Sequence, residues 1–312
     1  MHFRNLGSSG LKVSAIGLGT NQFGGKVDFK RAAEIISAAL DEGINFIDTS
    51  NSYQSGRSEE AIGKALQGRR QSVLIATKVH NQVGDGPNDA GASRKHILKA
   101  VEDSLRRLQT DYIDLYQVHR WDPGTPILET MRTLTYLVRS GKVRYIGASN
   151  FDAWQLTWAN ALAEREGLIP FISIQPHYHM LERGIESELM AACRYFGIGV
   201  LPYFPLAGGF LTGKYRQGQP IPAGSRGNDS PYVQNYFTPD NFSRLEKLEA
   251  LARERGRSIN ELAHSWLLAQ PQISSVISGA TNPDQVRANA AGADWGLTTG
   301  DLLEIESVLE GV

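Results

Sequence analysis

Cysteine is scarce in this chain. Cys193 is the only cysteine among its 312 residues. A lone thiol cannot close an internal disulfide or build a thiolate cage around a metal ion. Low cysteine use is typical of proteins in a reducing cytosol, so we expect a cytoplasmic protein.

An excess of one charge sign is also missing. The sequence has 32 Lys and Arg residues against 33 Asp and Glu residues, for a formal net charge of -1. Proteins that bind nucleic acid or an anionic membrane usually have an excess of positive charge, and this sequence has no such excess.

Long apolar runs are absent from the sequence. No 18 consecutive residues are apolar, and Met1 to Gly10 lack the apolar centre of a signal peptide. Hydrophobic residues make up 41% and charged residues 21%, which is typical of a globular protein with a sizeable core. We therefore expect a soluble, unprocessed chain without nucleic-acid or membrane partners, whose oligomeric state stays open.

Short β-branched runs alternate with amphipathic stretches along the whole chain. This order predicts parallel strands joined by crossover helices. Eight such units favour a (β/α)8 barrel, an α/β fold, over a doubly wound sheet, and we expect one domain over residues 1–312. The expected strands are Ala15–Gly19, Asn45–Asp48, Val73–Thr77, Ile113–Gln117, Val143–Ala148, Ile172–Gln175, Gly199–Pro202 and Ser275–Ser278.

The segments between the strands carry their own signals. Asp28 and Ser93 stand where N-caps of two amphipathic helices are expected. The turn Gly7–Gly10 predicts an N-terminal hairpin that plugs the bottom of the barrel. The stretch from Pro205 to Asn241 is too long for a simple connection, so we expect a functional flap there. A final helix that ends near Val312 is predicted by Leu302, Leu303, Ile305 and Leu309.

Three segments match known binding motifs only in part. Gly17–Gly24 has the wrong glycine spacing for a dinucleotide fingerprint. Gly208–Lys214 fits the start of a phosphate loop, but Tyr215 stands where Ser or Thr must hold Mg²⁺, so only a phosphate-binding role for Lys214 remains. His177 and His179 form a His-x-His pair without a third ligand in view, so we expect packing roles and no metal site.

Four polar residues follow neighbouring strands of the expected barrel. Asp48 closes the second strand, Tyr53 lies five residues on, Lys78 closes the third and His119 follows the fourth. The C-terminal ends of barrel strands form one mouth, where chemistry takes place. We expect these four side chains to meet there.

These residue types suit proton transfer to a carbonyl oxygen. A tyrosine hydroxyl has a pKa near 10, and a cation beside it favours its anionic form. Two unit charges about 4 Å apart interact by about 4 kcal/mol at an effective dielectric near 20, so we expect Lys78 to lower the pKa of Tyr53 before desolvation is subtracted. Asp48 would hold Lys78 charged, and His119 would hydrogen-bond the substrate. None of these groups supplies electrons, which points to hydride from a cofactor.

Several spaced motifs resemble those of the aldo-keto reductases, and the resemblance covers essentially the whole chain. Within that family the chain is most similar to bacterial reductases and to potassium-channel β-subunits. The motifs are Asp48-Thr-Ser-Asn-Ser-Tyr53, Thr77-Lys78, Asp114-Leu-Tyr-Gln-Val-His119, Gly147-Ala-Ser149-Asn150, Gln175, Pro202-Tyr203-Phe-Pro205-Leu206, and Gly279-Ala-Thr281 with Gln285 and Asn289.

The resemblance implies an NADP(H)-dependent oxidoreductase that reduces aldehydes or ketones to alcohols by hydride transfer. Tyr53 would be the general acid, tuned by Lys78 and Asp48, and His119 would orient the carbonyl. Phe204 stands where relatives commonly have serine. The residues implied to bind NADPH or NADP+ are Gly19, Thr20, Asn21, Asp48, Ser149, Asn150, Gln175, Tyr203, Phe204, Pro205, Leu206, Ala207, Lys214, Arg226, Gly279, Thr281, Gln285 and Asn289.

The small-molecule carbonyl substrate is expected against Phe23, Tyr53, His119 and Trp121. Tyr232 and Tyr236 of the flap are further candidates for the rim of its pocket. Two other classes stay open: a cofactor-binding regulatory or redox-sensing module with slow turnover, and a hydrolase or aldolase that uses Lys78 as a Schiff base.

Overall fold

Eight parallel strands form the centre of the described part of the chain. The computed structural model describes residues 1–311; Val312, where the expected domain and final helix end, lies outside the described residues. The strand order is β10-β3-β4-β5-β6-β7-β8-β9, and the parallel bridges Val200–Ile273 and Tyr203–Ile277 join the two outer strands. The expected (β/α)8 barrel is thus confirmed. Its strands are Ile16–Gly19 (β3), Phe46–Asp48 (β4), Leu74–Val79 (β5), Ile113–Val118 (β6), Val143–Ser149 (β7), Ser173–Gln175 (β8), Gly199–Val200 (β9) and Val276–Gly279 (β10).

Each strand lies within two residues of its expected position. β9 is the shortest and ends at Val200, two residues before the expected end. Leu201 still donates its backbone N–H to Ile174, but Pro202 has no N–H with which to continue the ladder.

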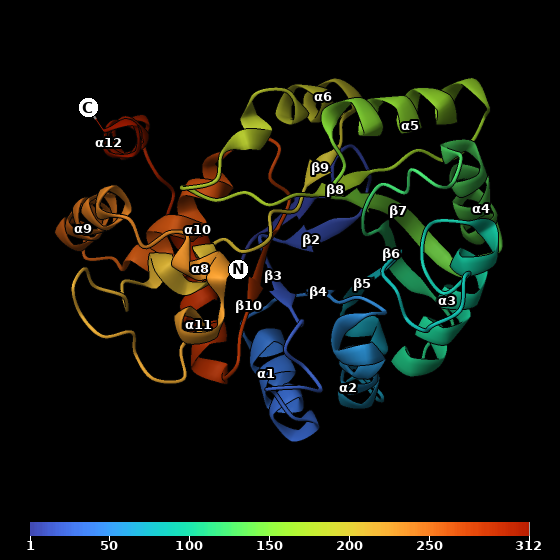
Figure 1. The fold of residues 1–312 in the computed structure, drawn as a ribbon, viewed down its shortest axis with the longest axis horizontal. Helices are drawn as coiled ribbons and strands as arrows, with labels where there is room; N and C mark the ends of the chain where they lie inside the picture. Colours follow the sequence, from blue (N-terminus) through green and yellow to red (C-terminus); the bar gives the residue numbers. More distant parts are fainter. Residues whose placement is uncertain (312) are drawn as a thin grey trace.

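Helices surround the strands, as Figure 1 shows. The Asp28 carboxylate accepts from the Arg31 backbone N–H at 2.8 Å, and Ser93 accepts from His96 at 3.3 Å, so both expected N-caps are confirmed. The longer helices are Phe29–Asp41 (α1), Arg57–Ala65 (α2), Arg94–Leu108 (α3), Ile127–Arg139 (α4), Ala153–Arg165 (α5), Leu189–Phe196 (α6), Pro239–Glu254 (α9), Ile259–Ala269 (α10), Pro283–Ala291 (α11) and Thr299–Glu310 (α12).

The N-terminal hairpin closes one end of the barrel. Phe3–Asn5 (β1) and Lys12–Ser14 (β2) pair antiparallel. Leu6 and Val13 are fully buried. They belong to a cluster with the inward-facing apolar residues Phe46, Ala76, Leu115, Leu201 and Ile277. The expected plug is therefore confirmed, and it leaves the opposite end of the strands for the site.

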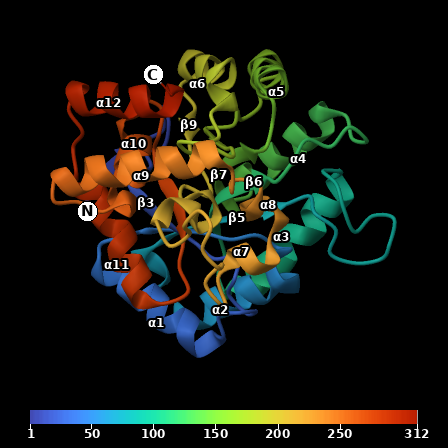
Figure 2. The same cartoon turned by 60° about the vertical axis from the view of Figure 1, so that its left-hand side comes forward.

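The segment between β9 and α9 folds over that opposite end. It contains a short 3-10 helix at Ala207–Thr212 and two one-turn helices, Arg226–Asp229 (α7) and Pro231–Gln234 (α8). In Figure 2 this segment, coloured from gold to orange, lies in front of the strands. Among residues 1–311, no helix has both the length and the apolar character needed to cross a bilayer.

Candidate active site

A polar layer lies above the apolar floor of the barrel. Side chains two residues apart on a strand point to the same side. Phe46, Ala76 and Leu115 belong to the apolar cluster, so the residues two positions further on, Asp48, Lys78 and Gln117, also point inward. The sheet register pairs Asp48 with Ala76, and Lys78 with Gln117, which brings the polar side chains to adjacent levels.

Asp48 and Lys78 form a buried ion pair in this layer. Lys78 Nζ donates to Asp48 Oδ2 at 2.6 Å and to the carbonyl oxygen of Thr49 at 2.8 Å. Asp48 Oδ1 accepts from the side-chain amides of Gln117 at 3.2 Å and Gln175 at 2.8 Å. Burial lowers the pKa of Lys78, but Asp48 and Tyr53 outweigh it and the net pKa is raised. Lys78 is therefore a protonated, fixed cation.

Tyr53 meets this cation from the loop between β4 and α2. Lys78 Nζ donates to the Tyr53 hydroxyl oxygen at 3.4 Å and lies 5.0 Å from the ring centroid. The phenol proton is therefore free to reach another acceptor. The loop turns through left-handed backbone at Gln54 (φ 51) and Ser55 (φ 56), which non-glycine residues rarely adopt and a functional loop often retains.

The pKa of Tyr53 differs from the expectation. Burial raises it, Lys78 lowers it, and the net pKa lies above the ordinary value of 10.0. The predicted direction of the Lys78 effect is right, but desolvation of the phenolate is the larger effect.

His119 completes the group as a neutral imidazole. Its Nδ1 lies 3.2 Å from Ser50 Oγ and 3.3 Å from the amide nitrogen of Asn81, a donor. Burial, followed by the charges of Lys78 and Arg120, lowers its pKa to about 2. Because Nδ1 accepts, the ring proton lies on Nε2, which is a donor. The His119 and Tyr53 rings meet edge to face with centroids 5.9 Å apart.

These residues open into a cavity of about 560 Å³ between the strand ends and the flap. Apart from Ala207, which is buried beside it, every residue implied to bind the cofactor lines this cavity. Of the expected substrate residues, Tyr53 and His119 line it. Phe23 is fully buried in the core, and Trp121 packs on Phe151 and Trp154 outside the lining.

Further lining residues carried no signal in the sequence. Gln22, Lys26, Arg120 and Asn260 are examples. All four are polar and lie in loops or at a helix start, so only the folded chain brings them to the cavity. Tyr232 and Tyr236, by contrast, are absent from this lining.

Short polar side chains and one aromatic ring line the cavity beside His119. Ser149 donates to the Gln175 carbonyl at 2.8 Å, and Asn150 donates to the His119 carbonyl at 3.1 Å. The Tyr203 hydroxyl donates to Asn150 Oδ1 at 2.9 Å. The Tyr203 ring stacks on His177 with an interplanar angle of 13°. The hydrogen bond and the stacking together fix the Tyr203 ring as a flat aromatic surface at the cavity wall.

His177 and His179 are used in packing and hydrogen bonding. His177 bonds the Tyr232 hydroxyl, and His179 Nε2 lies 3.2 Å from the Tyr236 hydroxyl. The two tyrosine hydroxyls are 2.9 Å apart. This series of hydrogen bonds connects α8 of the flap to the segment after β8.

Two cations lie at the flap side of the cavity. Lys214 and Arg226 both line it, and neither is ion-paired with a carboxylate of residues 1–311. Arg226 lies 5.3 Å from the centroid of the Phe204 ring. A Cβ added at Gly209, whose φ is 107, would lie 2.9 Å from Lys214 Nζ, so glycine leaves room for the ammonium group. Unpaired cations beside a cavity suit an anionic ligand.

The far end of the cavity lies at the N-terminus of α11. Asn282 caps this helix through the Gln285 backbone N–H at 2.9 Å, and Thr281 donates to the Gln285 side chain. Asn260 donates to Asn289 at 3.3 Å, while its own Oδ1 is buried and has no partner among residues 1–311. That oxygen is an acceptor that an N–H donor in the cavity would reach through a small rotation of the amide.

Known proteins are similar to this chain over nearly its whole length. The model of the aldo/keto reductase family matches residues 15–310. A protein of Arabidopsis thaliana named as a probable voltage-gated potassium channel subunit beta is 39% identical over 302 residues, which covers 94% of this chain and 92% of the relative. The aldo-keto reductase YhdN of Bacillus subtilis is 38% identical over 99% of this chain and 94% of its own length. A further protein of the same organism, named as the uncharacterized oxidoreductase YrpG, is also 38% identical, over 100% of this chain and 97% of its own length.

Proposed function

The chain belongs to the aldo/keto reductase family, and we propose that it is an NADP(H)-dependent oxidoreductase that reduces aldehydes or ketones to alcohols. Tyr53 would be the general acid. The observation that carries the proposal is the linked arrangement of Asp48, Lys78 and Tyr53 at the mouth of the barrel.

The polar atoms of the cavity fit a phosphorylated dinucleotide. The unpaired cations Lys214 and Arg226 suit its phosphates. The orphaned Asn260 Oδ1 suits an exocyclic amino group such as that of adenine. At the other end, Ser149, Asn150 and Gln175 would bind the carboxamide, and Tyr203 would stack on the nicotinamide ring. Thr281, Gln285 and Asn289 would hold the adenosine side.

The side chains around Tyr53 provide the proton. When bound, the nicotinamide supplies the hydride that the protein itself lacks. The Tyr53 hydroxyl donates its proton to the carbonyl oxygen, and Lys78 stabilises the phenolate that this leaves. Asp48 keeps Lys78 charged and aimed at Tyr53. His119, protonated at Nε2, donates a hydrogen bond to the same oxygen.

The ion pair argues against Lys78 as a Schiff-base nucleophile. Such a lysine must lose its proton, which a desolvated site without a carboxylate favours. Here Asp48 lies 2.6 Å from Nζ, and the pKa of Lys78 is raised. Borohydride trapping with a carbonyl compound is therefore expected to leave Lys78 unmodified.

The absorbance of reduced nicotinamide provides the direct test of the activity. The protein is assayed with NADPH and with NADH against a panel of aldehydes, ketones and sugars. We expect carbonyl-dependent oxidation of NADPH at a higher kcat/KM than of NADH. Binding of neither cofactor would contradict the proposal, and equal use of both would contradict its NADP(H) part.

A second function has support from the relatives named as channel subunits. In this alternative, the same cavity holds the cofactor as a redox sensor and turnover is slow. Exchange of bound cofactor against labelled NADP+ distinguishes the two. A catalyst exchanges its cofactor at least as fast as it turns over, whereas a sensor retains it over many minutes.

A further inference from the structure

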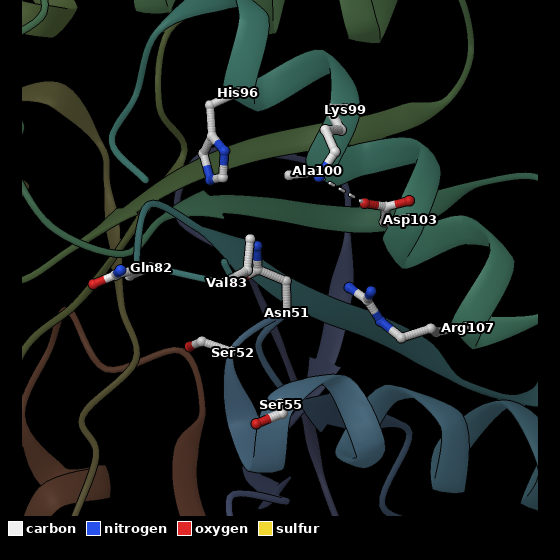
Figure 3. Close-up of a pocket in the computed structure, with 10 residues that line it drawn as sticks. All are labelled: Asn51, Ser52, Ser55, Gln82, Val83, His96, Lys99, Ala100, Asp103 and Arg107. Atoms are coloured by element: carbon white, nitrogen blue, oxygen red, sulfur yellow. Dashed lines mark ion pairs between the residues drawn. The ribbon is translucent and has the colours of Figure 1, made fainter. Parts of the chain in front are cut away.

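A second cavity lies behind the loop that carries Tyr53. It has a volume of about 210 Å³ and is separate from the cavity described above, with which it shares no lining residue. Figure 3 shows α3 on one side of it and the loop at residues 51–55 on the other. A water molecule occupies roughly 30 Å³ in the liquid, so the space exceeds that of a single ordered water.

Two residues that line this cavity each carry a buried acceptor that has no donor among residues 1–311. His96 is 1% exposed, and its Nδ1 lies 3.1 Å from the Asn88 carbonyl oxygen, so Nδ1 carries the proton and Nε2 is an acceptor. Within the described part of the chain His96 Nε2 has no hydrogen-bond partner, and neither has Oδ1 of Asn51, which is 2% exposed. Buried polar atoms are rarely left unpaired, because burial without a hydrogen-bond partner costs free energy. Both atoms have almost no accessible surface in this structure, so a ligand that donates hydrogen bonds would reach them through a small rotation of the two side chains.

The charges around the cavity cancel. Arg107 is paired with the buried Glu59 at 2.7 Å. Lys99 lies 3.6 Å from Asp89 and 3.7 Å from Asp103. No cation of the cavity is left to attract an anion, which contrasts with Lys214 and Arg226 in the first cavity. The site therefore favours a neutral ligand.

A hydroxyl group is neutral and donates a hydrogen bond, so it meets both requirements of this cavity. It donates to an acceptor such as Asn51 Oδ1, and it accepts from a donor such as the Lys99 ammonium. The entrance is open to solvent, since Ser55, Gln82 and Val83 at the rim are exposed. We propose that this cavity binds a small neutral polyol, and that its occupation holds the loop that carries Tyr53.

The coupling to the loop runs through direct contacts. Ser52 lines the cavity, accepts from Asn81 at 3.3 Å and lies 3.1 Å from Ser50 Oγ. Ser50 in turn contacts His119. Ser55, at the rim, has the left-handed φ of 56, so the loop is held by its surroundings and not by local preference. A ligand on this side adds contacts to the back of the loop, opposite the active site.

Hydrogen exchange of the full chain, saturated with NADPH, tests the proposal with erythritol as the probe. We expect saturable protection of peptides that cover residues 51–56 and 82–103. Ala100→Met fills the cavity and is expected to abolish this protection. The matched control Ala161→Met places the same side chain on the exposed face of α5 and is expected to retain it.

A second variant tests the hydrogen-bonding argument. Asn51→Leu removes one acceptor at similar size, and we expect the midpoint of protection to rise about tenfold, as for the loss of one hydrogen bond. Erythritol also stabilises proteins without binding, but that effect is the same in all variants. Non-saturating protection in the natural chain, or protection equal to that of Ala100→Met, would overturn the proposal. If Ala100→Met does not fold, an unchanged midpoint in Asn51→Leu overturns it.

Discussion

The Lys78 ammonium lies 2.6 Å from the Asp48 carboxylate inside the barrel, and neither side chain is more than 3% exposed. Two charges removed from water in this way depend on each other. Asp48 receives two further hydrogen bonds from Gln117 and Gln175, so its position is fixed from both sides. The pair is thus both a structural element of the barrel and the support of Tyr53.

The first prediction concerns stability. Asp48→Asn leaves Lys78 as an unpaired buried charge, so the free energy of unfolding falls by about 3–5 kcal/mol. Urea unfolding measures this loss. The double variant Asp48→Asn with Lys78→Met contains no buried charge and is expected to recover most of the stability, but none of the activity. A loss below about 1 kcal/mol in the single variant is incompatible with a coupled pair.

The second prediction concerns pH. The pKa of His119 is about 2 in the folded protein and 6.5 without the fold. Below pH 6.5 the unfolded chain therefore binds a proton that the folded chain does not, and stability falls with falling pH. Between pH 7 and pH 5 the natural chain is expected to lose about 2 kcal/mol more than His119→Gln.

Ser50→Ala is the control for this measurement. It removes the hydroxyl that lies 3.2 Å from Nδ1 but keeps the titrating ring, so it should retain the slope of the natural chain. Unfolding by urea at several pH values gives the slopes. Identical slopes in His119→Gln and the natural chain would contradict the prediction, because His119 would then bind as many protons in the folded state as in the unfolded state.

The third prediction concerns the cations at the flap. Lys214→Met and Arg226→Met are each expected to raise the KM for NADPH about tenfold or more, the effect of losing a charged hydrogen bond. The kcat should change little, because the phosphates are the same in the ground and transition states. Arg216→Met is the control, since Arg216 is ion-paired with Glu249 at 2.7 Å. An equal rise in all three variants would assign the effect to flap stability.

Much of the fold was predictable from the sequence because barrel strands are apolar runs bounded by turns. The eight strands, the plug and the N-caps at Asp28 and Ser93 depend on local patterns. The ends of the strands were less predictable. At β9, for example, Pro202 has no N–H and ends the backbone hydrogen bonding between strands. The four polar residues at the mouth follow from the rule that strand ends meet.

The remaining features depend on contacts distant in sequence. Gln117 is one neutral amide in a strand, and its role as a partner of Asp48 appears only when the register places it beside Lys78. Asn260 reaches the first cavity from the helix before β10. Burial raises the pKa of Tyr53, and this effect depends on packing that no single segment shows. The same holds for the second cavity, which forms between the Tyr53 loop and α3.

The most direct measurement compares Tyr53→Phe with the natural chain in two experiments on the same samples. Quenching of tryptophan fluorescence gives the Kd for NADPH, and rapid mixing with an aldehyde gives the rate of NADPH oxidation in a single turnover. We predict a Kd within about threefold and a rate lower by at least about a hundredfold, the contribution typical of a positioned proton donor. A single-turnover rate equal to that of the natural chain would show that the proton does not come from Tyr53, and the account of the site would be wrong.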